Sequence, residues 1–210
     1  MEKLYPRWEK ATNELIQKLE ELGIIFKNYN AIELFGRDGS WQTQLFAKKV
    51  KNIEIWEINK EFEKKLRENL PNSKIKIIDS IKTLNEKMKY QSFDLILLDN
   101  PNNIYGPNQE YCEHFDILKN IIKLIDKKAI IVFNVNRKPF NYNKFPQWKK
   151  RREEFYENKS TEEMSIKQLL VFYEKYFKKI GLETIFSINV IRVLFEEIDT
   201  NHYFAFLLTK

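Results

Sequence analysis

The stretch Ala31-Ile-Glu-Leu-Phe-Gly-Arg-Asp-Gly39 joins a short apolar run to a turn that contains two glycines. A helical pattern of apolar residues follows over residues 40–50. A strand that leads through a glycine turn into a helix is typical of the first unit of an α/β sheet. Gly36 and Gly39 permit a tight turn and let the backbone approach a ligand, because glycine has no Cβ. This stretch therefore predicts an α/β fold with a ligand at the turn.

Strands and helices alternate on both sides of this turn. Apolar runs predict parallel strands at residues 30–35, 52–57, 74–79, 93–99 and 129–135. Helical spacing of apolar residues predicts helices at 4–22, 40–50, 59–70, 80–88 and through 118–124. Asn59 is placed to cap the third of these helices and Ser80 the fourth. The nearly continuous apolar run at 93–99 is typical of a strand buried on both faces of a parallel sheet. Strands that alternate with helices imply right-handed crossovers.

The C-terminal part breaks this alternation. Residues 136–159 are basic and aromatic without a clear period. Ser160-Thr-Glu-Glu163 has the spacing of a capping box and predicts a helix to Ile180. Two strands then follow without a helix between them, at residues 182–195 and 202–208, and should form an antiparallel hairpin.

We therefore predict one α/β domain over residues 1–210, with a seven-stranded, mostly parallel, doubly wound sheet. An N-terminal helix precedes the sheet and an antiparallel strand hairpin ends it. The expected parts are an N-terminal helix (1–29), a ligand-binding core (30–135), a variable insertion or lid (136–159), and a C-terminal helix and hairpin (160–210).

Composition sets broad limits on class. Hydrophobic residues make up 43% and charged residues 31% of the 210 residues, which suits one globular domain. The apolar runs are too short to span a bilayer and the N-terminus shows no apolar signal-sequence core, so we expect a cytoplasmic protein. Cys112 is the only cysteine, which excludes an internal disulfide and a multi-cysteine metal site, and we expect no bound metal. The formal charge of +6 favours polyanions, but abundant Lys, Asn, Ile, Phe and Tyr together are expected from an A/T-rich genome.

The carboxyl ends of the first four predicted strands carry acidic or small polar residues. They are Glu33 with the glycine turn, Glu57, Asp79-Ser80 and Asp99-Asn100. In open α/β sheets, ligands bind beyond the carboxyl ends of the strands. One such acid is common at a strand end, but an ordered set in consecutive units indicates a binding site.

With these acids in place, the glycine turn resembles the first motif of class I S-adenosylmethionine-dependent methyltransferases. Residues 53–59, 77–80 and 93–101 are similar to the second, third and fourth motifs of that family, and the terminal hairpin is similar too. The resemblance implies S-adenosylmethionine (SAM) as cofactor, with its methionine end over the glycine turn. It also implies that Glu57 accepts hydrogen bonds from the ribose hydroxyls and that Asp79 accepts one from the adenine amino group. The implied cofactor site comprises Glu33, Phe35, Gly36, Arg37, Asp38, Gly39, Glu57, Ile58, Asp79, Ser80, Ile81 and Asp99.

A nicotinamide dinucleotide is the main competing ligand, since related sheets bind it. That ligand needs a G-x-G-x-x-G turn to bring backbone amides onto a pyrophosphate. The turn here lacks that spacing and places Asp38 where a diphosphate would approach. A pocket rich in acids suits the sulfonium and ammonium of SAM better.

The residues that would contact a methyl acceptor are less clearly indicated. The candidates are Asp99, Asn100, Tyr105 and His114. Asp99-Asn100-Pro101-Asn102 partly matches the D/N-P-P-aromatic tetrad of amino-group methyltransferases, or is simply a rigid proline turn. His114 is either a general base at the cleft or a buried structural histidine.

A small-molecule acceptor is favoured over RNA. The basic and aromatic residues of 136–159 suit a lid over a small molecule or a surface for single-stranded RNA, although Glu153, Glu154 and Glu157 would weaken such a surface. Sequence-specific DNA modification is disfavoured, because too little chain remains for an element that reads a groove. Departures from the first and fourth motifs leave a non-catalytic cofactor-binding or partner protein as another alternative. The oligomeric state is not indicated.

Overall fold

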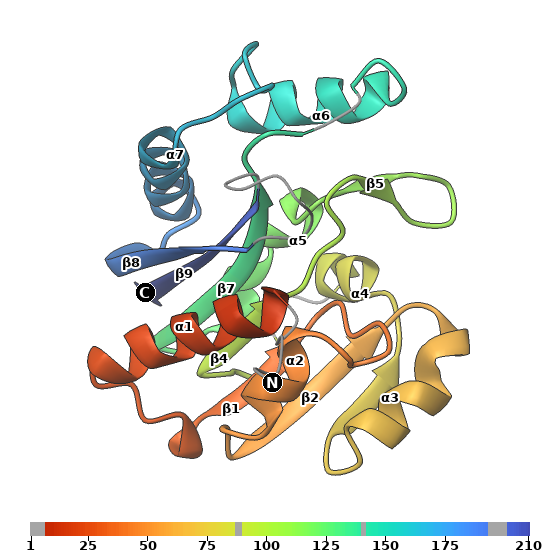
Figure 1. Ribbon diagram of the computed structural model, residues 1–210, viewed down its shortest axis with the longest axis vertical. Helices are drawn as coiled ribbons and strands as arrows, with labels where there is room; N and C mark the ends of the chain where they lie inside the picture. The colour runs from red at the N-terminus through yellow and green to blue at the C-terminus, as the bar shows by residue number, and fades with distance from the viewer. Residues whose placement is uncertain (1–6, 87–89, 140–141, 193–200) are drawn as a thin grey trace, which may run out of the picture.

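The computed structural model describes residues 7–86, 90–139, 142–192 and 201–210. Its main sheet has the strand order β3-β2-β1-β4-β7-β9-β8, and a two-stranded hairpin, β5-β6, stands apart from it (Figure 1). The strands are β1 (Asn30–Glu33), β2 (Asn52–Glu57), β3 (Lys74–Ile77), β4 (Leu95–Leu98), β5 (Ile104–Tyr105), β6 (Tyr111–Cys112), β7 (Lys128–Asn136), β8 (Glu183–Ile191) and β9 (Asn201–Thr209). The α-helices are α1 (Arg7–Glu21), α2 (Gln42–Ala47), α3 (Glu63–Asn69), α4 (Ser80–Glu86), α5 (Phe115–Leu118), α6 (Pro146–Tyr156) and α7 (Ile166–Lys179), with 3₁₀ turns η1 (Phe26–Asn28), η2 (Lys60–Phe62) and η3 (Ile121–Leu124).

The predicted fold class is confirmed. Strands β3, β2, β1, β4 and β7 pair in parallel, in register along their lengths. Strand β9 runs antiparallel to both of its neighbours, β7 and β8, and lies between them. The chain between the end of β8 at Ile191 and the start of β9 at Asn201 is shorter than the dozen or so residues that a parallel crossover needs, so β9 returns antiparallel to β8.

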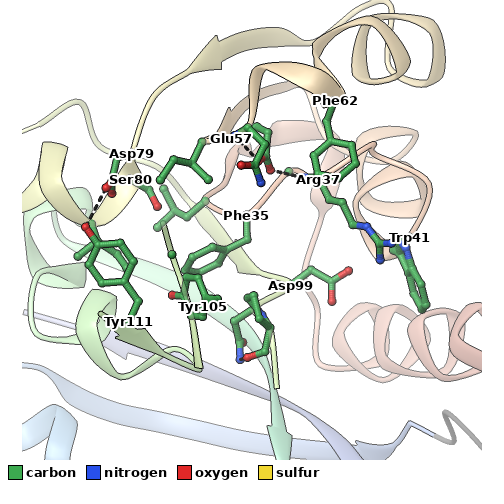
Figure 2. A pocket seen from close by; sticks show the side chains of 18 of the residues that line it. Phe35, Arg37, Trp41, Glu57, Phe62, Asp79, Ser80, Asp99, Tyr105 and Tyr111 are labelled. Carbon is green, nitrogen blue, oxygen red and sulfur yellow. Dashed lines mark hydrogen bonds between the residues drawn. The ribbon is translucent and has the colours of Figure 1, made fainter. Parts of the chain in front are cut away.

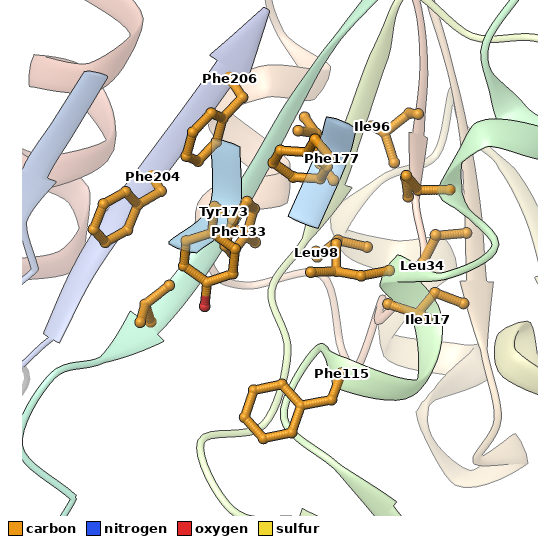
Figure 3. Close-up of a cluster of buried hydrophobic side chains, with 14 of the residues drawn as sticks. Leu34, Ile96, Leu98, Phe115, Ile117, Phe133, Tyr173, Phe177, Phe204 and Phe206 are labelled. Atoms are coloured by element: carbon orange, nitrogen blue, oxygen red, sulfur yellow. The ribbon is translucent and has the colours of Figure 1, made fainter. Parts of the chain in front are cut away.

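Each face of the sheet carries its own hydrophobic core, as a doubly wound sheet requires. Along β7, Ile131, Phe133 and Val135 face one core, whereas Ile130 and Val132 face the other. Helices α1, α2 and α3 cover the second core, and α4, α5, α6 and α7 cover the first. The first core is strongly aromatic where β7 and β9 meet α7 (Figure 3), with Phe133, Tyr173, Phe177, Phe204 and Phe206 all buried.

Two of the predicted helix caps are wrong. Asn59 makes no side-chain cap, because the chain enters a 3₁₀ turn before α3. Ser80 is the first residue of α4, and the cap is Asp79, whose Oδ1 accepts a hydrogen bond from the Lys82 amide at 2.9 Å. An acid at this position also interacts favourably with the helix dipole.

The capping box of the long C-terminal helix lies five residues later than the sequence predicted. Ser165 caps α7 and Gln168 completes the box. The expected box at residues 160–163 does not form, because Thr161 is buried, where its carbonyl accepts a hydrogen bond from the Tyr142 hydroxyl at 3.1 Å.

Residues 146–156 form a helix, α6, that the sequence did not reveal. Its buried residues, Trp148, Arg152 and Tyr156, are spaced four apart, as one helical face requires. The central residue of this face, Arg152, is charged, so the sequence does not show the regular spacing of apolar residues that would indicate a helix. The hairpin β5-β6 was also not predicted, because strands of two residues carry no period.

Arg152 and Glu113 form an ion pair whose two side chains are both fully buried. Arg152 also donates a hydrogen bond to the Asn136 carbonyl at 2.8 Å, and Trp148 donates one to Glu113 at 2.8 Å. These bonds join α6 to the end of β7 and to the segment between β6 and α5.

Some predictions fall on residues that are not described. These are the start of the N-terminal helix at residues 4–6, residues 87–88 of the helix after β3, and residues 193–195 of the first hairpin strand. Within the described ranges, the structure contains no helix with the length and apolar character needed to cross a membrane.

We expect Arg152→Met to lower the free energy of unfolding by about 3–5 kcal/mol, because it leaves the Glu113 carboxylate buried without its partner. Lys150→Met is the matched control: it removes the same charge from the same helix, but Lys150 is exposed and 3.9 Å from Glu154. The control should change stability by about 1 kcal/mol or less. Urea unfolding of both variants measures the difference, and equal effects would contradict the prediction.

Candidate functional site

A cavity of about 790 Å³ lies at the carboxyl ends of the parallel strands. Residues directly after β1, β2, β3 and β4 line it, and the β5-β6 hairpin closes one side. Figure 2 shows Asp79, Ser80 and Tyr111 at one end, Glu57 in the middle, and Asp99, Arg37 and Trp41 toward the other end. Of the strand-end acids, Glu57, Asp79 and Asp99 converge on this cavity.

The glycine turn is shaped by packing on β2. The Gly36 amide donates a hydrogen bond to the Trp56 carbonyl at 2.8 Å, and a Cβ on Gly36 would overlap the Ile55 side chain. Gly39 has φ +71°, and a Cβ there would lie 2.6 Å from Leu70. The sequence assigned both glycines to a tight turn and to ligand approach. The Gly39 amide closes the turn by donating to the Gly36 carbonyl at 2.9 Å, and Gly36 lines the cavity. The structure adds a further reason, which is the close contact of the turn with β2 and with Leu66 and Leu70.

Glu33 is fully buried behind the cavity and does not line it. Its Oε1 accepts hydrogen bonds from the amides of Phe35 at 3.0 Å and Asp99 at 3.1 Å, and its Oε2 accepts one from Thr43 at 3.0 Å. Burial, with a smaller contribution from the nearby Asp99 charge, raises the pKa of Glu33 to about 8. Glu33 thus holds the turn rather than contacting a ligand directly.

Glu57 lines the middle of the cavity at the end of β2. Its Oε2 accepts a hydrogen bond from the Arg37 amide at 2.6 Å, and its Oε1 accepts one from the Asn59 amide at 2.7 Å. Arg37 has φ +45°, a strained conformation that brings its amide to this carboxylate. Burial raises the pKa of Glu57.

Asp79 lies at one end of the cavity and uses both of its oxygens. Oδ1 caps α4, and Oδ2 accepts a hydrogen bond from the Tyr111 hydroxyl at 2.8 Å. Tyr111 belongs to β6, so this bond joins the hairpin to the end of β3. Apolar Ile58 and Ile81 line the cavity nearby.

Asp99 and Arg192 form an ion pair at the cavity wall, 3.0 Å apart. Arg192 follows β8 and comes from a part of the sequence that no motif indicated. The guanidinium groups of Arg192 and Arg37 lie 5.2 and 5.7 Å from the centre of the Trp41 ring. This end of the cavity therefore presents one carboxylate and two cations.

The acceptor candidates divide into two groups. Asp99, Asn100 and Tyr105 line the cavity, and the Tyr105 hydroxyl donates to the Glu113 carbonyl at 2.9 Å. His114 does not line it: this residue is fully buried, 2.7 Å from the Tyr173 hydroxyl and 3.4 Å from the Asn100 amide nitrogen. Burial and the nearby Arg152 charge lower the pKa of His114 well below its usual value. It is a structural residue, and the general-base alternative is not supported.

Nine of the residues expected at the cofactor line the cavity, and three do not. Those that line it are Phe35, Gly36, Arg37, Glu57, Ile58, Asp79, Ser80, Ile81 and Asp99, whereas Glu33, Asp38 and Gly39 do not. The sequence missed Trp41, Phe62, Tyr111, Asn134 and Arg192. Trp41 lies just after the glycine turn and Phe62 just after the second motif, so the sequence could have indicated that they line the site. Tyr111 and Arg192 reach the site only through tertiary packing.

No described residue between 136 and 159 lines the cavity. Helix α6 packs instead in the aromatic core, where Phe115 and Phe155 stack with ring centres 3.9 Å apart. In this arrangement the segment is not a lid. Four of its basic side chains pair closely with acids: Lys149 with Glu162, Arg151 with Asp116, Lys138 with Glu163, and Arg152 with Glu113.

Comparison with solved structures identifies the fold. The chain is similar to N-methyltransferase NodS from Bradyrhizobium japonicum (TM-score 0.56, 12% identity, covering 94% of this chain and 96% of that one). It is similar to magnesium protoporphyrin IX methyltransferase from Synechocystis with bound SAM (TM-score 0.55, 10% identity, 95% and 78% covered). It is also similar to the tRNA m1G37 methyltransferase of M. jannaschii (TM-score 0.54, 12% identity), covering 97% of this chain but 49% of that one.

The chain has the class I SAM-dependent methyltransferase fold, as the motifs predicted. At these levels of identity the likeness shows the fold alone. No protein-family profile and no curated protein sequence matches the chain.

We expect Glu33→Gln to remove a pH dependence of stability. The raised pKa means that the folded protein binds a proton at Glu33 that the unfolded chain has lost, so wild-type stability falls as the pH rises from about 4.5 toward about 8. In the variant the amide oxygen can accept from Phe35 and Asp99, and the NH₂ group can donate to Thr43. Wild type should therefore lose stability relative to the variant, by up to about 1.4 kcal/mol per pH unit in this window.

Thermal unfolding of both proteins from pH 5 to pH 9 measures this difference. Glu174→Gln, at an exposed position on α7, is the control and should follow the wild-type curve. Parallel curves for wild type and Glu33→Gln would show that Glu33 is ionised throughout.

Proposed function

We propose that this protein is a SAM-dependent methyltransferase that acts on a small molecule. The observation that carries the proposal is the order of groups along the cavity: Asp79, then Glu57, then Asp99. Adenine, ribose and the methionine chain follow one another in the same order along SAM.

Each position matches the polarity of the part it would hold. The Glu57 carboxylate accepts hydrogen bonds from ribose hydroxyls in the middle of the cavity, beside the turn that holds it in place. Asp79 accepts a hydrogen bond from the adenine amino group, with Ile58 and Ile81 against the ring. Hydrogen bonds to a charged group contribute about 1.5–3 kcal/mol each.

When bound, SAM supplies a methyl group on a positively charged sulfur. The nucleophile of the acceptor would attack the methyl carbon in line with the carbon–sulfur bond, and the sulfur would leave as the thioether of S-adenosylhomocysteine. The protein's contribution is to orient the acceptor and to exclude water. Asn100, Pro101 and Tyr105 form the wall where the acceptor would lie. The Tyr105 ring packs edge-on against Phe35, with ring centres 5.8 Å apart, which keeps this wall apolar.

A small acceptor is favoured by the cavity and by the pairing of the basic side chains. The cavity has a volume in the range of small-molecule sites, about 300–1,000 Å³. Between Lys138 and Arg152, most basic groups are paired with acids rather than displayed along one track. RNA is the second candidate, favoured by the net charge of +6 and by the likeness to a tRNA methyltransferase.

Calorimetry with SAM and S-adenosylhomocysteine tests the cofactor, and release of S-adenosylhomocysteine from SAM over a panel of small acceptors tests the reaction. We expect binding of both nucleosides and turnover with at least one acceptor class. Failure to bind either at high micromolar concentration would exclude the proposal. Binding without turnover on small molecules or RNA would favour a non-catalytic cofactor-binding protein.

We expect Glu57→Ala to weaken S-adenosylhomocysteine binding about tenfold or more, because about 1.4 kcal/mol or more of charged hydrogen bonding to the ribose is lost. Glu174→Ala, at an exposed position outside the cavity, is the control and should bind as wild type does. Calorimetry measures both affinities, with a thermal melt to check the fold. Unchanged affinity in a folded Glu57→Ala variant would show that Glu57 does not hold the ribose.

A further inference from the structure

Strand β8 forms one edge of the main sheet (Figure 1). It pairs with β9 on one side, and its outer side makes no backbone hydrogen bond to any described residue. Helices α1 and α7 pack against β8, one in each core. Every residue of β8 except Val190 keeps some exposure, whereas β9 is buried from His202 to Phe206. Within the part of the chain that the structure describes, the outer row of backbone groups on β8 is therefore unpaired.

The two edges of the sheet differ in how they are protected against pairing with another strand. Native edge strands are commonly short or carry lysine, because an unpaired edge is a template for another chain. The opposite edge, β3, has both features: it is four residues long and contains Lys74 and Lys76. Strand β8 is nine residues long and has no charged residue or proline after Glu183. A β-bulge, another protective feature, interrupts only its start, and residues 186–191 pair regularly with β9.

The sequence of β8 is self-complementary about Ile188. Two copies of an edge strand that meet across a two-fold axis run antiparallel, and each residue lies opposite one on the same face. With the axis at Ile188, Ser187 of one copy lies opposite Asn189 of the other, and Ile185 lies opposite Ile191. Because Ile185 and Ile191 are 58% and 44% exposed, this register brings exposed apolar side chains together. The strand carries no charge between these two isoleucines, so no like charges meet.

We propose that the outer edge of β8 pairs antiparallel with β8 of a second copy of this chain, in the register centred on Ile188. A second copy fits better than an unrelated strand, because the exposed isoleucines are placed symmetrically about that residue. The pairing would join the two sheets and satisfy the unpaired backbone groups of both copies. The inference does not depend on the proposed function, since it concerns the sheet edge. Arg192, directly after β8, lines the cavity, so each site would lie beside the interface.

Sedimentation equilibrium of the full chain at low salt tests the pairing, and we expect the wild type to dimerise at micromolar concentrations. Ser187→Lys/Asn189→Lys and Ser187→Glu/Asn189→Glu place like charges opposite each other in this register, whereas Ser187→Lys/Asn189→Glu places opposite charges there. We expect both like-charge variants to dimerise about tenfold or more weakly than the opposite-charge variant. The net charge of +6 cannot produce this result, because a general charge effect would move the two like-charge variants in opposite directions.

Ile191→Lys should also weaken the dimer, and Val171→Lys is its matched control, since Val171 is 42% exposed but lies on α7. A wild type that stays monomeric would overturn the inference, as would equal dimerisation of the three double variants. If those variants do not fold, Ile188→Cys decides. In this register its thiol lies opposite the same thiol of the other copy, so oxidised glutathione should yield a disulfide-linked dimer. Val171→Cys is the control, and equal crosslinking of both variants, or none of Ile188→Cys, would overturn the inference.

Discussion

A single buried carboxyl group, that of Glu33, joins three of the segments that line the site. It accepts hydrogen bonds from the turn after β1, from the first residue after β4, and from Thr43 in α2. Without an acceptor there, two backbone amides and a hydroxyl would be buried without partners, and each such loss costs about 1–3 kcal/mol. The position of Asp99 relative to the glycine turn, and so the shape of the cavity between them, depends on this group.

Burial makes ionisation of Glu33 costly, while its three donors favour the ionised form, and the raised pKa shows that burial prevails. The nearby Asp99 charge adds to that cost, and Arg192 offsets it by pairing with Asp99. The strand ends β1 and β4 and the C-terminal hairpin are therefore coupled electrostatically as well as by sheet pairing. A cation bound beside Asp99 would act in the same direction as Arg192.

The fold could be predicted from local pattern because the central strands β4 and β7 contain unbroken apolar runs, β2 and β3 alternate apolar with polar residues, and helical spacing lies between the strands. β2, predicted at residues 52–57, has those bounds in the structure. The strand-end acids Glu57, Asp79 and Asp99 could be predicted for the same reason, since a parallel sheet brings its carboxyl ends together. What could not be predicted depends on side chains that are distant in sequence. Tyr111 reaches Asp79 from a hairpin with two-residue strands, and Arg192 reaches Asp99 across 93 residues.

Helix α6 shows why a run of basic residues in the sequence need not form a basic surface. Its sequence has four basic residues in succession at 149–152, the feature that most suggested a nucleic-acid surface. In the structure, successive helical positions point in different directions, so these four cations reach different environments. Arg152 is buried against Glu113, Arg151 pairs with Asp116, and Lys149 pairs with Glu162. Only Lys150 stays largely in solvent, with 77% of its side chain exposed and Glu154 3.9 Å away. A run of charge on a helix is thus divided among core, neighbouring element and water, and it forms a continuous surface only where the charges recur every three or four residues.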